Sequence, residues 1–220
     1  MRLLIGNKNY STWSLRPWLV LKHFVIPFSE EFAPLSGEKW QENIQERSPS
    51  GKVPVLFDGD LVITETIAII EYIADIHPHK PVWPADIASR ALARAASAEM
   101  HAGFSALRNA APMNLRASHP GRIDYAEIKS DLRRIEVLWG ELLARSAGPY
   151  LFGSFSAADA MFAPVAARIR TYDLPVSTLT RNYVEAIYDL PAFREWYEEA
   201  LKESWIVEKD EIDYIQGKTK

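Results

Sequence analysis

Residues 50–66 read SGKVPVLFDGDLVITET and carry the strongest local structural signal of the chain. Two β-like runs, at 53–57 and 61–63, flank Asp58-Gly59-Asp60, and an Asp-Gly pair between such runs favours the tight turn of a β-hairpin. A helical pattern follows at once over residues 66–76, with isoleucines along one face. We therefore predict a strand, a turn, a second strand and a helix in succession.

Residues upstream of this hairpin extend the same domain. A short apolar run predicts a strand at 2–5 and alternation predicts another at 28–33, with a helix between them at 15–24. A short helix or irregular segment is expected at 39–46. Because strands joined by a helix pair in parallel, the first part of the chain is predicted to be α/β, a small mixed sheet covered by helices.

A domain boundary is predicted where the composition changes, near residue 77. Three prolines between residues 78 and 84 stop helices and stiffen the chain, and the sequence beyond them is almost entirely helical in pattern. We expect one domain at 1–77, a linker at 78–86 and an all-helical domain at 87–220.

Four patterns support the helical domain. An alanine-rich pattern predicts one long helix over 87–116, and apolar residues three and four apart predict an amphipathic helix over 128–142. Ser156-Ala157-Ala158-Asp159 has the spacing of a capping box, in which the serine caps the helix and the aspartate reaches back. A buried helix is expected to follow at 160–167, and a last apolar helical stripe at 193–201.

The composition excludes several classes of site. The chain has 220 residues and no cysteine, with 25 Lys and Arg against 29 Asp and Glu. Without cysteine there is no disulfide, no thiolate metal site and no cysteine nucleophile, and we expect no bound metal. The net charge of −4, with scattered basic residues, argues against nucleic acid as a partner. No apolar run approaches the roughly 20 residues of a membrane span, and the first residues lack a signal-peptide pattern, so a cytoplasmic protein without a membrane partner is expected.

Residues 9–17, NYSTWSLRP, place small hydroxyl residues at the predicted start of the first helix. Free N–H groups and the helix dipole favour an anion at such a position. Capping of the helix by Ser11, Thr12 or Ser14 explains the same residues. The pattern alone leaves both interpretations open.

Two further segments can each be explained either by local structure or by ligand binding. Pro54 restrains Val53 to extended geometry, which suits a turn into a strand or, if the bond is cis, pairing of the Val53 backbone with an extended ligand. Glu65 and Thr66 begin a helix, where they either cap it or hold the ammonium and carboxylate groups of an amino acid.

The order and spacing of these three segments resemble the glutathione transferases. Residues 11–16, STWSLR, resemble the Ser-Ser-Cys-Ser-aromatic-Arg motif of the zeta class, and residues 50–56, SGKVPVL, resemble the cis-proline segment of the family. Glu65-Thr66 is similar to its Glu-Ser pair, and Phe155-Ser156-Ala157-Ala158-Asp159 to its capping-box motif. The resemblance covers nearly the whole chain, and it implies a thioredoxin-like βαβ-ββα domain followed by a helical bundle.

The resemblance implies that the co-substrate is the tripeptide glutathione, whose thiol becomes a thiolate nucleophile. A free thiol has a pKa of about 8.5, and a hydroxyl hydrogen bond and a helix N-terminus lower that pKa. By similarity, Ser11 is expected to donate to the sulfur, with Thr12 as the second candidate and Tyr10 as the third. Arg16 matches the arginine of the motif and is expected to support the site electrostatically.

The same resemblance assigns the other contacts with glutathione. Val53, next to Pro54, would pair its backbone with the cysteinyl part of the tripeptide. Lys52 would lie near the glycine carboxylate, while Glu65 and Thr66 would hold the γ-glutamyl end.

A second substrate is expected between the domains, against the first helices of the bundle. Arg108 would attract an anionic substrate there, and His101 is expected to be structural rather than an acid–base group. The candidate pocket residues are Tyr10, His101, Phe104, Arg108 and Met113.

Three functions remain open. The leading expectation is a homodimeric, detoxifying transferase that adds the glutathione thiolate to a small electrophile. The alternatives are a glutathione-dependent cis–trans isomerase resembling maleylacetoacetate isomerase, and a non-catalytic binding module. The chain departs from the zeta pattern at Trp13, where the motif has cysteine, and at Met113, where isomerases of the class have an amide. The missing cysteine favours the serine-type branch of the family over its redox branch.

Overall fold

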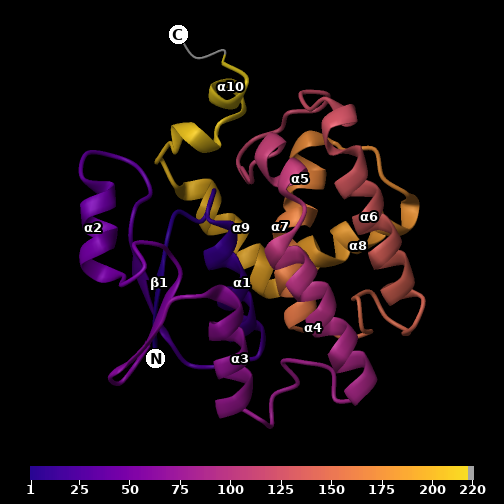
Figure 1. Ribbon diagram of the computed structural model, residues 1–220, viewed down its shortest axis with the longest axis horizontal. Coiled ribbons are helices and arrows are strands. Elements are labelled where there is room, and N and C mark those ends of the chain that lie inside the picture. Colours follow the sequence, from indigo (N-terminus) through magenta and orange to yellow (C-terminus); the bar gives the residue numbers. More distant parts are fainter. Residues whose placement is uncertain (218–220) are drawn as a thin grey trace.

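The N-terminal part is a four-stranded mixed sheet with the strand order β2-β1-β3-β4 (Figure 1). This computed structural model describes residues 1–217. The strands are β1 (Arg2–Ile5), β2 (Ser29–Phe32), β3 (Val55–Asp58) and β4 (Leu61–Ile63). β1 pairs in parallel with β2 and antiparallel with β3, which pairs antiparallel with β4. The predicted βαβ unit and hairpin are both confirmed, and Gly59 takes a φ of +56° in the hairpin turn, which glycine adopts without steric penalty.

Helices cover both faces of this sheet. α1 (Thr12–His23) and α3 (Thr66–Ile76) pack on one face, in the cluster that contains Leu3. α2 (Trp40–Arg47) packs on the other face, in the cluster that contains Leu4. Because successive side chains of a strand point to opposite faces, the continuous apolar run of β1 serves both layers.

The C-terminal part is a helical bundle followed by a short tail (Figure 1). Its elements are α4 (Ile87–Ala102), α5 (Ser105–Ala110), α6 (Tyr125–Leu143), α7 (Ala157–Tyr172), α8 (Thr178–Asp189), α9 (Pro191–Lys202), the 3₁₀ helix η1 (Glu208–Asp210) and α10 (Ile212–Ile215). Within residues 1–217, no helix has the length and apolar character needed to cross a bilayer.

The prediction of one long helix over 87–116 is wrong. α4 ends at Ala102, and Phe104 has a φ of +57°, in the left-handed region, before α5 begins. Gly103 joins the two helices, and a Cβ atom there would lie 2.8 Å from the backbone oxygen of Glu99. Any residue with a Cβ atom would clash with this oxygen, so the turn between α4 and α5 requires glycine at position 103. α8 has no counterpart among the predicted helices.

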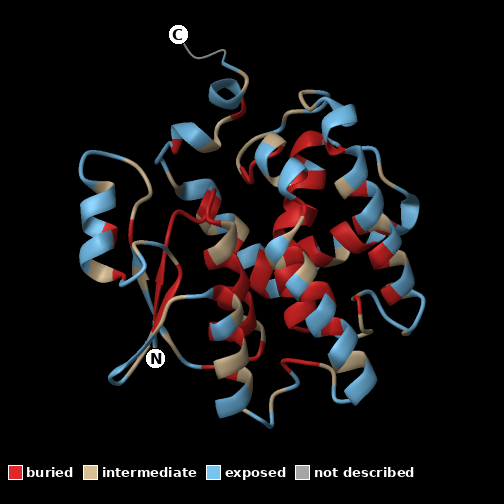
Figure 2. Ribbon diagram, viewed as in Figure 1, coloured by how far each residue is buried: buried red, intermediate tan, exposed pale blue. Residues whose placement is uncertain are grey.

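α7 lies in the middle of the bundle and is buried on nearly all sides (Figure 2). Its capping box is confirmed, since one Asp159 oxygen accepts from the Ser156 N–H at 2.9 Å and from the Ser156 hydroxyl at 3.1 Å. The other oxygen accepts from the Leu151 N–H at 2.9 Å and from the Tyr183 hydroxyl at 3.0 Å. Burial raises the pKa of Asp159 to about 6, and the four donors oppose that rise.

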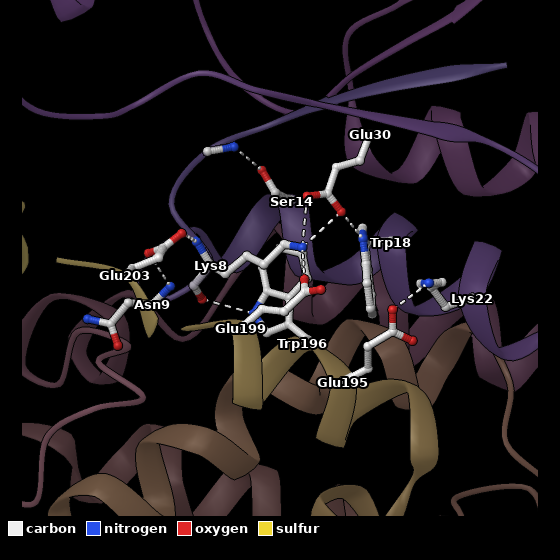
Figure 3. A network of polar contacts seen from close by, with 11 residues as sticks. Lys8, Asn9, Ser14, Trp18, Lys22, Glu30, Glu195, Trp196, Glu199 and Glu203 are labelled. Carbon is white, nitrogen blue, oxygen red and sulfur yellow. Dashed lines mark hydrogen bonds and ion pairs between the residues drawn. The ribbon is translucent and has the colours of Figure 1, made fainter. Parts of the chain in front are cut away.

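Lys8 joins the two parts of the molecule just before α1 (Figure 3). Its ammonium lies 2.8 Å from Glu30 Oε1 and forms a second ion pair with Glu199 of α9. It also lies over the rings of Trp18 and Trp196, at 5.1 and 5.3 Å from their centroids. The Trp18 indole donates to Glu30, and the Trp196 indole donates to the Lys8 carbonyl. The buried cation therefore links α1, α9 and the residues of β2.

We predict that Lys8→Met weakens this link. Methionine keeps apolar contact with the two tryptophans but leaves Glu30 and Glu199 without their shared cation. These carboxylates are 34% and 41% exposed, so water screens part of the loss, and we expect the free energy of unfolding in urea to fall by about 1–3 kcal/mol. Arg134→Met, which breaks a more exposed ion pair with Glu99, is the control and should cost less than about 1 kcal/mol. Equal losses in the two variants would contradict a special role for Lys8.

Candidate functional site

A cleft of about 350 Å³ is lined by residues from both parts of the molecule. The N-terminal part contributes the start of α1 and the loop before β3, and the bundle contributes α5, α7 and the tail. Seven residues predicted from the sequence to belong to the site line this cleft: Tyr10, Ser11, Thr12, Lys52, Val53, Arg108 and Met113.

Ser11 lies at the N-cap position of α1, immediately before the first helical residue. Its hydroxyl makes no capping hydrogen bond and instead donates to Ser14 Oγ at 2.7 Å, which also accepts from the Gly6 N–H at 3.1 Å. The free N–H groups of the first turn of α1 give this end of the helix a positive potential. A hydroxyl donor and a helix N-terminus therefore meet at the cleft, which is the environment that stabilises a thiolate.

The Tyr10 hydroxyl is already engaged. It donates to Glu211 in the tail and accepts from Arg116 Nη2 at 3.0 Å. Burial and the Glu211 carboxylate raise the pKa of the Tyr10 phenol. Because its proton is committed to Glu211, Tyr10 is poorly placed to donate to a ligand, whereas Ser11 shares its proton only with another hydroxyl.

Arg16 lies behind the cleft rather than in it. Its guanidinium is almost completely buried and donates to the backbone oxygens of Thr12, at 2.9 Å, and Met161, at 3.0 Å. Burial lowers its pKa well below the ordinary value, and the nearby Arg168 and Arg108 lower it further. Arg16 thus ties the start of α1 to α7 and adds positive charge beneath the site.

The cleft is strongly cationic. Among residues 1–217, the cleft is lined by the basic residues Lys52, Arg108, Arg168 and Lys209 and by one carboxylate, Asp210. Arg108 and Arg168 donate to backbone carbonyls, and within residues 1–217 neither has an ion-pair partner. Burial and repulsion from Arg108 lower the pKa of Arg168 to about 10. Guanidiniums held in this way are suited to binding a carboxylate.

The glutathione-contact candidates divide into two groups. Lys52 and Val53 line the cleft, and the bond between Val53 and Pro54 is cis. Thr66 is buried, and its hydroxyl donates to the Trp13 carbonyl at 3.2 Å, which joins the start of α3 to the start of α1. The Glu65 side chain is 63% exposed beside this junction and does not line the cleft.

Two pocket candidates lie outside the cleft lining. His101 contacts the Trp13 ring, at 5.1 Å between centroids, and its Nε2 lies 3.9 Å from Glu65. Phe104 is buried against Phe162, at 6.5 Å between ring centroids.

Nine of the described cleft residues were absent from the site predicted from the sequence. Five are Leu35, Trp40, Ile44, Gly51 and Pro112, and the other four are Trp13, Arg168, Lys209 and Asp210. Arg168 offered a signal, because a charged residue within an otherwise apolar helical run is rarely buried without a role. Lys209 and Asp210 offered none, since the tail that carries them has no periodic pattern.

Comparisons with known proteins show what the two parts of the chain resemble. Family models for the glutathione S-transferase N-terminal domain and C-terminal domain match residues 10–76 and 91–199. The chain is 30% identical to a probable maleylacetoacetate isomerase of Caenorhabditis elegans, over 83% of this chain and 86% of that protein. It is 31% identical to glutathione S-transferase Z2 of Arabidopsis thaliana, over 73% and 74% of the two chains.

Solved structures share the fold. A maleyl pyruvate isomerase, described as a bacterial zeta-class glutathione S-transferase, superposes with a TM-score of 0.71 at 23% identity, covering 94% of this chain and all of that one. A glutathione transferase homologue from Burkholderia, solved with bound glutathione, gives a TM-score of 0.70 at 24% identity, with 90% and 97% of the two chains covered.

Proposed function

We propose, because this chain belongs to the glutathione S-transferase family, that its cleft presents the glutathione thiolate to a small electrophile that carries a carboxylate. The observation that carries the proposal is that Ser11, at the start of α1, lines the same cleft as Arg108 and Arg168, neither of which forms an ion pair within residues 1–217. A thiolate and a carboxylate are both anions, and the cleft offers each of them donors and positive charge.

Glutathione would occupy the side of the cleft formed by domain 1–77, joined to domain 87–220 by the linker 78–86. Lys52 would pair with its glycine carboxylate, and the Val53 backbone with its cysteinyl part. Glu65 and Thr66 would hold the γ-glutamyl end at the junction of α1 and α3. The Ser11 hydroxyl would then turn from Ser14 toward the sulfur and stabilise the thiolate.

The positive charge of the cleft favours isomerisation of a substrate that carries a carboxylate over conjugation of a neutral electrophile. In that reaction the thiolate adds to a cis double bond of the substrate, and the resulting single bond rotates. The carbon–sulfur bond then breaks, which releases the glutathione thiolate and re-forms the double bond in the trans configuration. Arg108 and Arg168 would hold a carboxylate of the substrate in place while the other end turns. Conjugation uses the same first step but retains the new carbon–sulfur bond.

The protein would act as a cytoplasmic homodimer in the detoxification or breakdown of small electrophiles. Exposed apolar side chains support a dimer, since Leu61 and Val62 on the edge strand β4 are 45% and 41% exposed and Leu92 on α4 is 36% exposed. The sheet edge of one subunit would pack against the bundle of its partner.

Calorimetry with glutathione tests the first step of this proposal. We expect saturable binding below millimolar glutathione, and turnover of maleylacetone in the same preparation that exceeds turnover of a neutral electrophile. Arg168→Ala should reduce turnover of maleylacetone more than turnover of the neutral electrophile. Maleylacetone carries a carboxylate that would lose its guanidinium partner, whereas the neutral electrophile has no such group. Absence of binding at millimolar glutathione would reject both enzymatic functions and leave the non-catalytic binding module.

Ser11→Ala should lower the rate while leaving glutathione bound. One lost hydrogen bond to an anion is worth about 1–3 kcal/mol, or roughly 5- to 150-fold in turnover. Thr12→Ala is the matched control, because Thr12 follows Ser11 in the sequence, also carries a hydroxyl and lines the same cleft. Full turnover in Ser11→Ala combined with its loss in Thr12→Ala would transfer the role to Thr12.

Sedimentation at micromolar concentration tests the dimer. We expect a single species of twice the chain mass, 49.8 kDa from two chains of 24.9 kDa. Leu61→Glu together with Val62→Glu should shift that species toward the monomer, because charged residues disfavour an apolar interface. A monomer in the unmodified protein would contradict the dimer while leaving the glutathione site untouched.

A further inference from the structure

Trp13 lies under two guanidiniums at the edge of the cleft. The Cζ atoms of Arg16 and Arg108 are 4.1 and 4.9 Å from the centroid of its ring. Tryptophan is the aromatic side chain that attracts a cation over its face most strongly. The indole therefore offers negative potential to two positive groups that have no carboxylate partner of their own among the described residues.

Arg108 depends on this ring more than the other two arginines of the site. Arg16 and Arg168 are buried, and each makes a hydrogen bond of 3.0 Å or shorter to a backbone oxygen. Arg108 is only partly buried, and its two hydrogen bonds, to the His101 and Gly103 carbonyls, are 3.3 and 3.2 Å long. It projects from α5, a helix of six residues, and is repelled by both neighbouring arginines.

Trp13 itself is held firmly. It belongs to the first turn of α1, and its carbonyl accepts the hydrogen bond from the Thr66 hydroxyl. Its ring also contacts the ring of His101, at 5.1 Å between centroids. A fixed aromatic ring beneath a loosely held cation sets the position of that cation.

We propose that Trp13 is a positioning residue which holds the Arg108 guanidinium at the cleft and thereby sets the preference of the enzyme for electrophiles that carry a carboxylate. This inference rests on the proposed function, because it concerns the second substrate of the same site. It assigns a role to a residue at which the chain departs from the cysteine of the zeta motif.

A matched pair of substrates measures the preference directly. 4-Chloro-3-nitrobenzoate and its methyl ester react alike: the glutathione thiolate forms a carbon–sulfur bond to the ring, and chloride leaves with the electron pair of the broken carbon–chlorine bond. They differ in one negative charge. The readout is the ratio of kcat/KM for the acid to that for the ester, with KM and kcat determined separately.

Three single variants and one double variant, Trp13→Leu with Arg108→Ala, test the role of the ring. Trp13→Leu keeps an apolar side chain but removes the π face, and should lower the acid-to-ester ratio about tenfold, mainly through the KM of the acid. Trp13→Phe keeps a weaker π face and should remain within about threefold of the unmodified protein. Arg108→Ala should lower the ratio as Trp13→Leu does, and the double variant should lower it little further, because the two residues act as one unit.

The control is Arg94→Ala, which removes an arginine that lies over the Trp83 ring, at 5.5 Å, outside the cleft. It should leave the ratio unchanged. An unchanged ratio in Trp13→Leu or Arg108→Ala would overturn the inference, as would a Trp13→Phe variant as defective as Trp13→Leu, or effects that multiply in the double variant.

Binding of the unreactive 3-nitrobenzoate and its methyl ester, measured by calorimetry, provides a test without turnover. If Trp13→Leu weakens the binding of the acid but not that of the ester, the inference is supported. Equal weakening of both compounds contradicts it. An unmodified protein that binds the acid but shows no glutathione-dependent turnover contradicts the proposed function instead. The two failures are therefore distinguishable.

Discussion

α1 packs against both parts of the molecule, and the site depends on this shared burial. One side of the helix contacts α3 and the sheet, and the other contacts α7 and α9. Leu15, Trp18 and Leu19 are completely buried as a result. Because α1 cannot move relative to either part without exposing this surface, the residues at its N-terminus stay fixed between the sheet and the bundle. Lys8 and Arg16 reinforce the arrangement at the same end of the helix, one through ion pairs and the other through backbone carbonyls.

The electrostatics of the cleft follow from that fixed framework. Arg16, Arg108 and Arg168 come from three different helices, and each donates its hydrogen bonds to carbonyl oxygens, while Asp210 stabilises Arg168 at longer range. Their mutual repulsion is an energetic cost that a bound anion relieves. The tail contributes negative charge, since Asp210 lines the cleft and Glu211 accepts a hydrogen bond from the Tyr10 hydroxyl. Burial raises the pKa of Asp210, while Lys209 and Arg168 favour its ionised form.

Local patterns were enough to predict most of the sheet and several of the helices. The Asp-Gly turn predicted the hairpin, the strand–helix–strand order predicted the parallel β1–β2 pair, and the capping box predicted the start of α7. The errors occurred where local preference and packing disagree. The alanine-rich run has high helix propensity from residue 87 to Ala102, but Gly103 and Phe104 divide it, because the chain turns there to place α5 against α6.

The amino-acid sequence alone identified the family, the serine at the start of α1 and the segment before β3, because each of these is encoded within a few neighbouring residues. Only the packing of the folded chain showed that Arg168 lies in the cleft, that the Trp13 ring lies beneath Arg108, and that Glu211 accepts a hydrogen bond from the Tyr10 hydroxyl. These contacts join residues that are 60 to 201 positions apart in the sequence, and no local periodicity encodes which surfaces of two helices meet. Helix and turn signals arise from neighbours within a few residues, whereas the charge distribution of the cleft arises from contacts that exist only after the bundle has closed on the sheet.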